Sequence, residues 1–492
     1  YSIDSSAHAV IMADVGSTEM DLSRGNYAVE FTRHIRIHIL DKNAYEEATF
    51  QIPTFHDRNG NNGDRIDDIR AVSYNLNEGK VEETKMGKDA IFTDKAARSV
   101  DITKFTLPAV HEGTIIDVQY KIFSGFRFGI RGYAFQGRLP RLWTEYKASI
   151  PSFTQFQIDR KGYLDVATST EEHSAMLGQL SIVFTDHRWV AENVPGFKPE
   201  GFVSAASNYL SRVEFHLTAL TAPLEPQTLV TSWPTATRRL LEDEDFGRKF
   251  DQNNPWLDDV MQPMMKGTQL EQARAIYAYV RDKIKCEGNS GSVYLTQSVR
   301  DVLRKGSATV SDVNLLLVTM LRHAGIQADP VMLSTRENGF VYTLFPMLNR
   351  FNYVITIATI DGQTIYLDAS KPRLGFGRLM PECYNGMGRV INSNADVVLL
   401  PADSLREKSN VGVMLGLDGK NGWKGYVQEA QGHIASYESR STIQEKGQDA
   451  FRADPYFYGK GFAEVGAERI LALSWIVLRL SYEAMWPCAS CT

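Results

Sequence analysis

The apolar residues of this 492-residue chain change their spacing part-way along the sequence. Near the start they alternate with polar residues, as in the run from Val29 to Ile39, where most odd positions are apolar. From residue 268 onward they recur every three or four positions. Alternation is typical of half-buried β-strands, whereas the longer period is typical of amphipathic helices. The pattern therefore predicts a β-rich part first and a part with helices after it.

Further segments before residue 240 have the composition of short strands. The alternation returns at residues 116–122, and turn-forming clusters such as Asn77-Glu78-Gly79-Lys80 separate the candidate strands. The other candidates lie around residues 69–76, 145–150, 180–185 and 210–220. Many short strands joined by Gly- and Asn-containing turns favour an antiparallel sandwich. We predict a β-sandwich domain over residues 1–240.

Two helices are predicted after residue 250. Thr268 and Glu271 match a capping box, and the apolar residues after them have helical spacing, so the first helix covers residues 269–285. The second runs from about Asp312 to Ala324 and is apolar nearly all round, which predicts a central, buried helix that stops at Gly325. Strands are expected next, at residues 328–334, 340–345, 352–360 and 363–368. Together these elements predict an α+β domain over residues 250–395.

Residues 396–492 are expected to form a short, β-rich C-terminal region with an atypical tail. Val411–Leu417 and Trp423–Gln428 have strand-like patterns and flank a turn at Asp418-Gly419. The tail from Phe462 onward has a helix-like pattern instead. Its apolar run Ile470–Leu480 is about eleven residues long, and a membrane-spanning helix needs roughly 18 or more. We expect this run to be a buried element.

The composition argues against several classes of protein. The chain has 53 Lys and Arg residues against 59 Asp and Glu, and this net charge of −6 disfavours a nucleic-acid-binding protein. Four cysteines are too few for a disulfide framework, and Cys488 and Cys491 form a CxxC pair with no second pair to complete a zinc site. We expect a protein that does not span a membrane and needs no cofactor. Because the chain begins at Tyr1, we also expect that a signal peptide has been removed.

Residues 305–370 carry the strongest functional signal, in the runs GSATVSDVNLLLVTMLRHAGIQADPVMLSTRENG and FNYVITIATIDGQTIYLDAS. These runs resemble the core of the transglutaminase-like superfamily, which has a papain-like α+β fold. The resemblance implies a cysteine at the start of the buried helix, a histidine on a later strand and an aspartate on the strand after that. In such a set the helix start stabilises a thiolate, the histidine moves the proton, and the aspartate orients the histidine.

The first half of the chain has a resemblance of its own. Residues 25–240 are similar to a β-sandwich domain of unknown function that precedes transglutaminase-like domains in secreted bacterial proteins of the Bacteroidetes type. The pieces that carry this resemblance are Ile52-Pro53, residues 105–114 (FTLPAVHEGT), residues 195–197 (PGF) and residues 231–233 (TSW). The resemblance implies a periplasmic or secreted protein of the bacterial cell envelope.

The chain departs from the family pattern at two of its three catalytic positions. Asp312 and the run from Leu321 to Ile326 set the register, which places the family's cysteine at Val310. The histidine position falls on Tyr353, and only the aspartate is retained, as Asp368. Valine has no titratable proton, and tyrosine, with an ordinary pKa near 10, is a poor base at neutral pH. The register therefore predicts a degenerate triad.

Other residues could supply a nucleophile or a base. Ser311 is adjacent to the cysteine position and is the possible substitute nucleophile, although it also fits a helix cap. Cys286 follows the first predicted helix and fits a small buried residue. His323 lies late on the second helix, at the wrong end for catalysis. Asp368 could also be a structural acceptor that holds the loop after its strand.

A possible calcium loop is the last pattern of chemical interest. Asp57, Asn59, Asn61 and Asp68 fall at positions 1, 3, 5 and 12 of the EF-hand template. Asn62 stands where the template requires glycine, and the template's final glutamate is replaced. A long hairpin turn explains these residues better, and we predict no metal site.

Two functions remain open. The first is a catalytically degenerate transglutaminase- or protease-like protein that serves as a peptide- or glycan-binding module, or an assembly module, of the bacterial cell envelope. The second is an active peptidase or amidase with a non-standard catalytic set, such as Ser311 with Asp368 and Tyr353. The missing cysteine and histidine favour the first. The two differ in whether Val310, Tyr353 and Asp368 converge with a thiol or an imidazole within hydrogen-bond reach.

Overall fold

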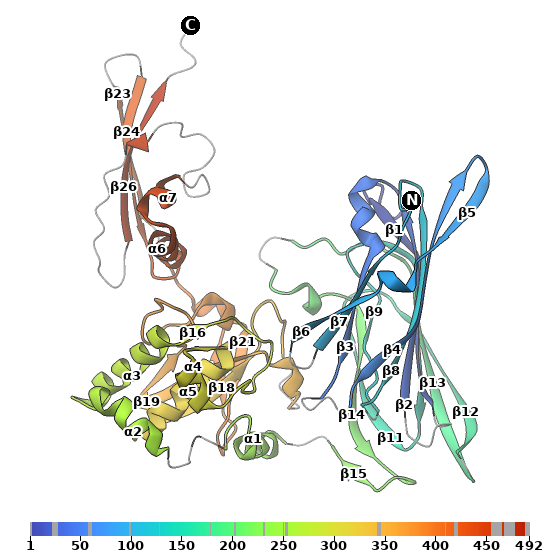
Figure 1. Ribbon diagram of the computed structural model, residues 1–492, viewed down its shortest axis with the longest axis horizontal. Coiled ribbons are helices and arrows are strands. Elements are labelled where there is room, and N and C mark those ends of the chain that lie inside the picture. The colour runs from blue at the N-terminus through green and yellow to red at the C-terminus, as the bar shows by residue number, and fades with distance from the viewer. Residues whose placement is uncertain are drawn as a thin grey trace. The chain divides into compact units, whose positions relative to one another are not determined.

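The structure is a computed structural model of the 492-residue chain. It describes all residues except 1, 22–27, 58–61, 98–99, 127, 178, 201–202, 230–231, 249, 251–253, 342–345, 409, 418–421, 454–464, 467–477 and 488–492. The chain divides into two compact units (Figure 1): residues 1–232 form the first, and the chain from residue 233, apart from residues 344–346, forms the second. The predicted domain borders at residues 240, 250 and 395 remain predictions.

The first unit is β-rich, as its alternating pattern predicted. An eight-stranded sheet has the order β12 (Ala167–Leu177), β13 (Leu180–Val194), β10 (Arg141–Pro151), β1 (Ala9–Asp21), β2 (Ala28–Ile39), β8 (Ile115–Ser124), β4 (Asp64–Asn77) and β5 (Lys80–Lys85). Neighbouring strands are antiparallel except β1 and β10, which are parallel. This one parallel pair differs from the expected antiparallel arrangement. Parallel neighbours need a long connection, and here β2 to β9 lie between them in the sequence.

Two smaller sheets complete the first unit. One has the order β3 (Thr49–Phe55), β7 (Val100–Thr106) and β6 (Phe92–Ala97). In the other, β14 (Arg212–Leu220) lies between β11 (Thr154–Lys161) and β15 (Gln227–Thr228), and β9 (Tyr133–Ala134) also pairs with β14. Short 3-10 helices at Lys42–Ala48, Lys88–Ala90 and Ala206–Asn208 lie in the connections. The strands predicted from alternation at residues 29–39 and 116–122 are confirmed as β2 and β8.

One hydrophobic core joins the three sheets. The Phe50 ring of β3 stacks on Phe105 of β7, with ring centroids 5.4 Å apart. On the other small sheet, the Phe215 ring of β14 lies 6.0 Å from Tyr146 of β10 and 5.7 Å from Trp189 of β13. Alternate residues of β2 and β8 are buried in the same core. Period-two alternation thus places one face of the long sheet against both smaller sheets.

A group of buried charges lies inside the first unit. The carboxylate of Asp14 on β1 is fully buried and accepts two hydrogen bonds from Arg33, at 2.8 and 2.7 Å. Arg141, on the parallel strand β10, places Nη1 2.9 Å from the same carboxylate. Burial alone would raise the pKa of Asp14, but the two guanidinium groups outweigh it and hold that pKa below its usual range. The carboxylate therefore stays charged and ties β1, β2 and β10 together.

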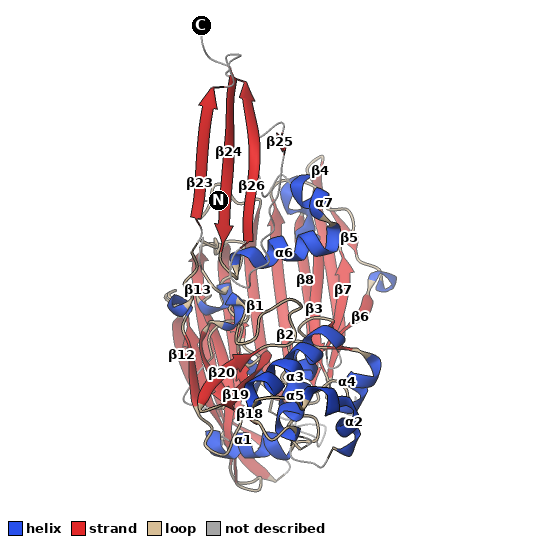
Figure 2. Cartoon of the chain, turned by 90° about the vertical axis from the view of Figure 1, so that its left-hand side faces the viewer, coloured by secondary structure: helices blue, strands red, loops and turns tan. Residues whose placement is uncertain are grey.

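The second unit contains the helices. Up to residue 323 these are α1 (Trp233–Glu242), α2 (Asp258–Met261), α3 (Gln269–Lys283), α4 (Val299–Lys305) and α5 (Val310–His323). A five-stranded sheet has the order β20 (Gln363–Leu367), β19 (Tyr353–Ile360), β18 (Gln327–Leu333), β21 (Gly386–Val390) and β22 (Val397–Leu400), and β16 (Lys285–Cys286) pairs in parallel with β17 (Ser307–Ala308). Figure 2 shows α3 and α5 next to β18 and β19. Short 3-10 helices lie at Pro255–Leu257, Gln262–Met264, Leu348–Arg350, Pro381–Cys383 and Ala402–Ser404.

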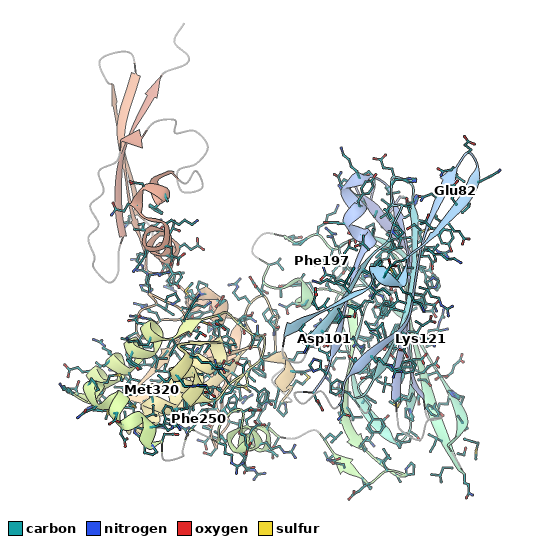
Figure 3. The ribbon with its side chains drawn as sticks, viewed as in Figure 1. Glu82, Asp101, Lys121, Phe197, Phe250 and Met320 are labelled. Carbon is teal, nitrogen blue, oxygen red and sulfur yellow. The ribbon has the colours of Figure 1, made fainter. Side chains whose placement is uncertain are left out.

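The predicted central helix is confirmed as α5. Every residue of α5 from Val310 to Leu321 is buried, because α3 and α4 cover it on one side and β18 and β19 on the other. Met320 on α5 and Phe250 are both part of this core (Figure 3). Gly325 follows the helix with a φ of 73°, in the left-handed region that glycine adopts without strain. The capping box that was predicted at Thr268 and Glu271 is also present.

The last part of the chain contains two unpredicted helices, α6 (Ala435–Lys446) and α7 (Gln448–Ala453). It also has a sheet with the order β23 (Asn410–Leu417), β24 (Gly422–Gln431), β26 (Leu478–Pro487) and β25 (Val465–Gly466). The helix-like prediction for the tail is wrong at β26, which pairs with β24 over its whole length. Most of the apolar run 470–480 lies outside the described residues. In the described part of the chain, no helix is both long and apolar enough to span a membrane.

One predicted strand falls mostly outside the described residues. Residues 340 and 341 of the expected strand 340–345 are not in a strand, and residues 342–345 lie outside the described part of the chain. The other three predictions for this region are confirmed as β18, β19 and β20.

Candidate functional site

Helix α5 begins with a reciprocal capping box. Thr309 is the N-cap residue, and its hydroxyl accepts from the backbone N–H of Asp312 while the Asp312 carboxylate accepts from Thr309 N at 3.1 Å. The same carboxylate accepts from the backbone N–H and the hydroxyl of Thr296, at 2.7 and 2.6 Å. Val310 is therefore the first residue of the helix. The start of α5 is held both by its own turn and by the preceding loop.

The expected role of Ser311 as a helix cap is wrong. Thr309 caps the helix instead, because Asp312 lies three residues after it and completes the box. Ser311 is fully buried within the first turn, and its hydroxyl donates to the backbone oxygen of Ser292 at 2.5 Å. This hydrogen bond directs the Ser311 proton to a carbonyl rather than to a base.

Tyr353 and Asp368 meet at the opposite side of this site. Tyr353 is the first residue of β19, and its phenol donates to Asp368 Oδ2 at 2.8 Å. Asp368 follows β20, and its other oxygen accepts from Asn314 Nδ2 at 2.9 Å and from the backbone N–H and hydroxyl of Ser370 at 2.9 and 2.6 Å. All four side chains are buried. The aspartate therefore has several donors and no direct cationic partner.

The buried position of Tyr353 changes its acid–base properties. Burial raises the pKa of its phenol well above the ordinary value, and the nearby charge of Asp368 raises it further. The phenol stays protonated at every physiological pH and acts as a hydrogen-bond donor to the carboxylate. Its pKa does not match that of a general base at neutral pH.

Val310 lies in the same hydrophobic cluster as Tyr353. That cluster, between the start of α5 and the five-stranded sheet, also contains Leu333 and Cys383, and Cys286 packs against it. The side chain of Val310 is buried and apolar. Its backbone N–H, the first amide of the helix, donates to the oxygen of Gly288 at 3.1 Å. A helix-start amide that could otherwise stabilise an oxyanion is therefore already bonded within the protein.

The two described thiols lie near the site but are not activated. Cys286 on β16 is half-buried, and its Sγ lies 3.9 Å from the oxygen of Gly288. Burial raises the pKa of the Cys286 thiol above its ordinary value. Cys383 is fully buried, and burial together with the charge of Asp368 raises its pKa well above the ordinary value. Reactive cysteines have lowered pKa values, whereas the pKa values of both these thiols are raised.

No thiol or imidazole completes the described set. The side-chain partners of Tyr353 are Asp368 and Ser370, and those of the Asp368 carboxylate are Asn314, Tyr353 and Ser370. His323 is at the far end of α5, where its ring bonds to Asp258 at 2.7 Å. Of the candidate triad residues Val310, Tyr353 and Asp368, the structure thus joins Tyr353 and Asp368 by a side-chain hydrogen bond.

A polar pocket of about 410 Å³ adjoins this pair. Tyr353 is one of its lining residues, and the others are Asn289, Gly291, Thr335, Glu337, Asn338, Asn352, Lys371 and Glu382. Lys371 and Glu382 form an ion pair at 2.7 Å, which raises the pKa of Lys371 although burial opposes it. The Lys371 ammonium also lies 6.0 Å from the centre of the Tyr353 ring. The site therefore opens to solvent through a pocket lined by polar groups.

Comparison with known proteins identifies this part of the chain. Residues 258–350 match the family model described as the transglutaminase-like superfamily. The chain contains a transglutaminase-like core. The matched residues include all of α5, so the helix with Val310 at its start belongs to this core.

A solved structure supports the same fold over a longer stretch. A protein from Parabacteroides distasonis, described as a "putative protease", is similar with a TM-score of 0.56 and 13% sequence identity, and the match covers 90% of this chain and 98% of that protein. At this identity the likeness concerns the fold alone. No curated protein sequence matches the chain.

The transglutaminase-like core has contacts that the sequence did not reveal. Asn314 binds three partners at once: Val354 O, Asp368 Oδ1 and the backbone N–H of Ala369, each at 2.9 Å. The position of Asn314, one turn after the start of a buried helix, is a signal that could have identified it. A buried amide inside an apolar run requires partners.

The calcium template is not supported as a metal site. Asn59 and Asn61 lie outside the described residues. Asp57 accepts from Asn62 N at 3.1 Å and closes a turn between β3 and β4, and Asp68 forms an ion pair with Arg70 within β4. Among the described residues, no group of three or more His, Cys, Asp or Glu side chains could hold a metal ion.

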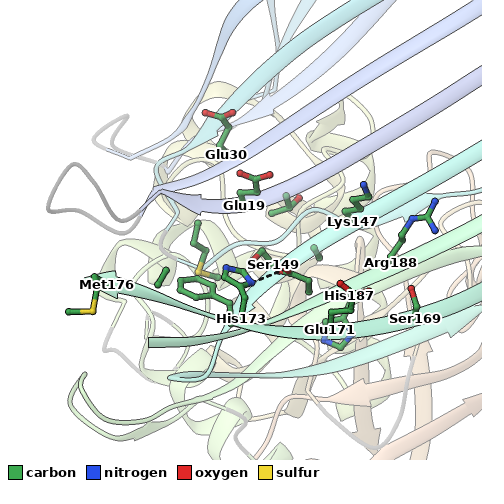
Figure 4. A pocket seen from close by; sticks show the side chains of 16 residues that line it. Glu19, Glu30, Lys147, Ser149, Ser169, Glu171, His173, Met176, His187 and Arg188 are labelled. Atoms are coloured by element: carbon green, nitrogen blue, oxygen red, sulfur yellow. Dashed lines mark ion pairs between the residues drawn. The ribbon is translucent and has the colours of Figure 1, made fainter. Parts of the chain in front are cut away.

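A larger pocket, of about 750 Å³, lies on the long sheet of the first unit (Figure 4). Its charged groups are largely paired: His173 Nδ1 is 2.9 Å from Asp186 Oδ2, and Arg188 is bound by Glu145 at 2.8 Å. Burial keeps the pKa of His187 below its ordinary value, so this imidazole is neutral at pH 7. Ser149 and Ser169 line the pocket, and neither has a described hydrogen bond to a base.

Replacing Asn314 with alanine is expected to destabilise the core by about 1–3 kcal/mol, because the buried oxygens of Asp368 and Val354 each lose a donor. Hydrogen exchange of the α5 and β19 amides in the full-length chain would measure the change. Asn394→Ala, at an exposed position, should alter exchange by less than about 0.5 kcal/mol. Equal effects of the two substitutions would contradict the role of Asn314.

Proposed function

We propose that this protein is a catalytically degenerate transglutaminase-like protein that binds a ligand without cleaving it. The ligand is a peptide or glycan segment, and the protein acts as a binding or assembly module of the bacterial cell envelope. A periplasmic or secreted location is part of the proposal, supported by the resemblance of residues 25–240 to sandwich domains of secreted bacterial proteins.

The observation that carries the proposal is the state of the three triad positions. By the register of the resemblance, the nucleophile position is Val310 at the start of α5, and its side chain is buried in an apolar cluster. The histidine position is Tyr353, whose raised pKa keeps its proton on the phenol. Asp368 accepts that proton in a hydrogen bond at 2.8 Å. The set has an acceptor and a donor in place but neither nucleophile nor base.

The alternative, an active hydrolase with Ser311 as nucleophile, has weaker support. The Ser311 hydroxyl donates to Ser292 O and is fully buried. The base proposed with it, Tyr353, forms its side-chain hydrogen bonds with Asp368 and Ser370. A serine nucleophile needs a base within hydrogen-bond reach, and none of the described contacts of Ser311 supplies one.

The purified protein is expected to show no amide hydrolysis or cross-linking that depends on a cysteine, because the pKa values of Cys286 and Cys383 are raised. Casein and a mixed peptide library would serve as substrates before and after alkylation with iodoacetamide. Peptide mapping would separate labelling at these two thiols from labelling at Cys488 and Cys491. Hydrolysis that is lost when Cys286 or Cys383 is alkylated would overturn the proposal.

A further inference from the structure

The pocket beside Tyr353 is lined mainly by polar side chains. Its volume of about 410 Å³ is within the roughly 300–1,000 Å³ of small-molecule sites, which are mostly lined by apolar side chains. Among the described residues, no aliphatic side chain lines the pocket, and the one aromatic lining residue, Tyr353, is almost fully buried. The described lining therefore offers a ligand amide, carboxylate and hydroxyl groups, together with the ammonium of Lys371 that is paired with Glu382.

Several of these groups have hydrogen-bonding capacity left over. Asn338 uses its amide N–H groups on Ser334 Oγ and Arg350 O, each at 2.9 Å, and its side-chain oxygen has no described partner. Asn289 accepts from Gly291 N, which leaves its amide N–H groups for a ligand. The exposed carboxylate of Glu337 has no hydrogen bond or ion pair with a described residue.

The positions of these groups are fixed by the neighbouring loop. Asn352 accepts from Thr335 N at 2.9 Å and donates to Thr335 Oγ1 at 3.0 Å. This pair connects the start of β19 to the loop that carries Glu337 and Asn338. The loop that carries Glu337 and Asn338 is thus held at Thr335, which lowers the entropy cost of binding through these two residues.

The lining disfavours two other kinds of ligand. An apolar peptide side chain would remove water from the carboxylate and amides without replacing their hydrogen bonds. An anion would meet the carboxylates of Glu337 and Glu382, and the one ammonium present, on Lys371, is already paired with Glu382. A hydroxyl group can donate to a carboxylate and accept from an amide at the same time, so neighbouring hydroxyls fit this lining.

We propose that the ligand of this pocket is a neutral oligosaccharide, held through Glu337, Asn338 and Asn289. This inference rests on the proposed function, because it assigns a ligand class to the same non-catalytic site. Of the peptide and the glycan that the proposed function leaves open, it selects the glycan.

The test is binding of the full-length protein to an array of neutral oligosaccharides, followed by calorimetry with the strongest binder. The double variant E337Q/N338A is expected to lose at least about tenfold in affinity, since it removes one charged and one neutral acceptor. The matched control E438Q, on the exposed face of α6, should bind as the unchanged protein does. Affinity should change less than about twofold between low and high salt, because a neutral ligand is not screened.

Three outcomes would overturn the inference: no neutral oligosaccharide binds, binding survives the double substitution, or hexalysine binds in a salt-sensitive way while the sugars do not. The last would make Glu337 part of a site for basic peptides. Mass spectrometry of the incubated sugar separates this test from that of the proposed function. Cleavage of a bound oligosaccharide would contradict the non-catalytic proposal but not the recognition of a sugar. Absence of binding would contradict the recognition of a sugar but not the non-catalytic proposal.

Discussion

Replacing Asp14 with asparagine is expected to lower the free energy of unfolding of the first unit by about 3 kcal/mol. The carboxylate is fully buried between Arg33 and Arg141, and Arg141 is only 7% exposed. Removing one member of a buried charge group leaves the other charges without a partner, which costs about 3–5 kcal/mol. We expect the lower end because Arg33 is 30% exposed and can turn to solvent. Hydrogen exchange of the β1, β2 and β10 amides in the full-length chain would measure it.

The matched control is Asp68→Asn on β4, whose ion pair with Arg70 is exposed. Exposed pairs contribute about 0–1 kcal/mol, so this variant should stay close to the unchanged protein. If both variants lose the same stability, the buried charges around Asp14 do not stabilise the first unit more than an exposed ion pair does, and the prediction is wrong.

The same group predicts a dependence of stability on pH. The pKa of folded Asp14 lies below its usual range, and an unfolded aspartate titrates near about 3.9. The stability from Asp14 is therefore fully present above about pH 4 and is lost as the pH falls through the lowered folded value. The gap between the unchanged protein and Asp14→Asn should narrow below pH 4 in the same exchange measurement.

The double substitution Val310→Cys with Tyr353→His is expected to create a reactive thiol in the second unit. A thiolate at the first residue of α5 would gain from the helix dipole, and an imidazole bonded to Asp368 could take its proton. A thiol pKa lowered from about 8.5 toward 7 would raise the rate of iodoacetamide labelling at position 310 on the order of tenfold over Val310→Cys alone. Peptide mapping would follow the labelling.

Each single substitution is a control for the double one. Val310→Cys lacks the base, and Tyr353→His lacks the nucleophile, so neither should reach the labelling rate of the pair. Peptide hydrolysis should remain low even in the double variant, because the first amide of α5 is bonded to Gly288 O and does not face a substrate. If Val310→Cys alone labels as fast as the double variant, Tyr353 does not occupy the base position, and the register of the degenerate triad is wrong.

The elements that the sequence predicted well depend on short separations along the chain. The capping box of α3 joins Thr268 to Glu271, and the strand β2 is defined by alternation over residues 28–39. The elements that it missed depend on partners that are far away. Pairing with β24 makes Leu478–Pro487 a strand, although its own composition indicated a helix. Local propensity is overridden when a strand partner is available.

The residues of the candidate site divide in the same way. The resemblance to the transglutaminase-like family named Val310, Tyr353 and Asp368 as triad positions, and the residue types there predict that a nucleophile and a base are absent. The cap of α5 was assigned to Ser311, two residues too late. The spacing of Thr309 and Asp312 matches a capping box and could have indicated Thr309.

What the sequence by itself determined is the order of β-rich and helical parts, the transglutaminase-like core, and which side chains stand where the resemblance places a triad. Tertiary structure alone decided how those side chains are bonded. Asn314 meets Asp368 across 54 residues of sequence, and Tyr353 meets it across 15. Burial, which raises the pKa of Tyr353 and Cys383, also results from packing of distant elements. Helix caps and alternation act over a few residues, whereas burial and strand register depend on the whole folded unit.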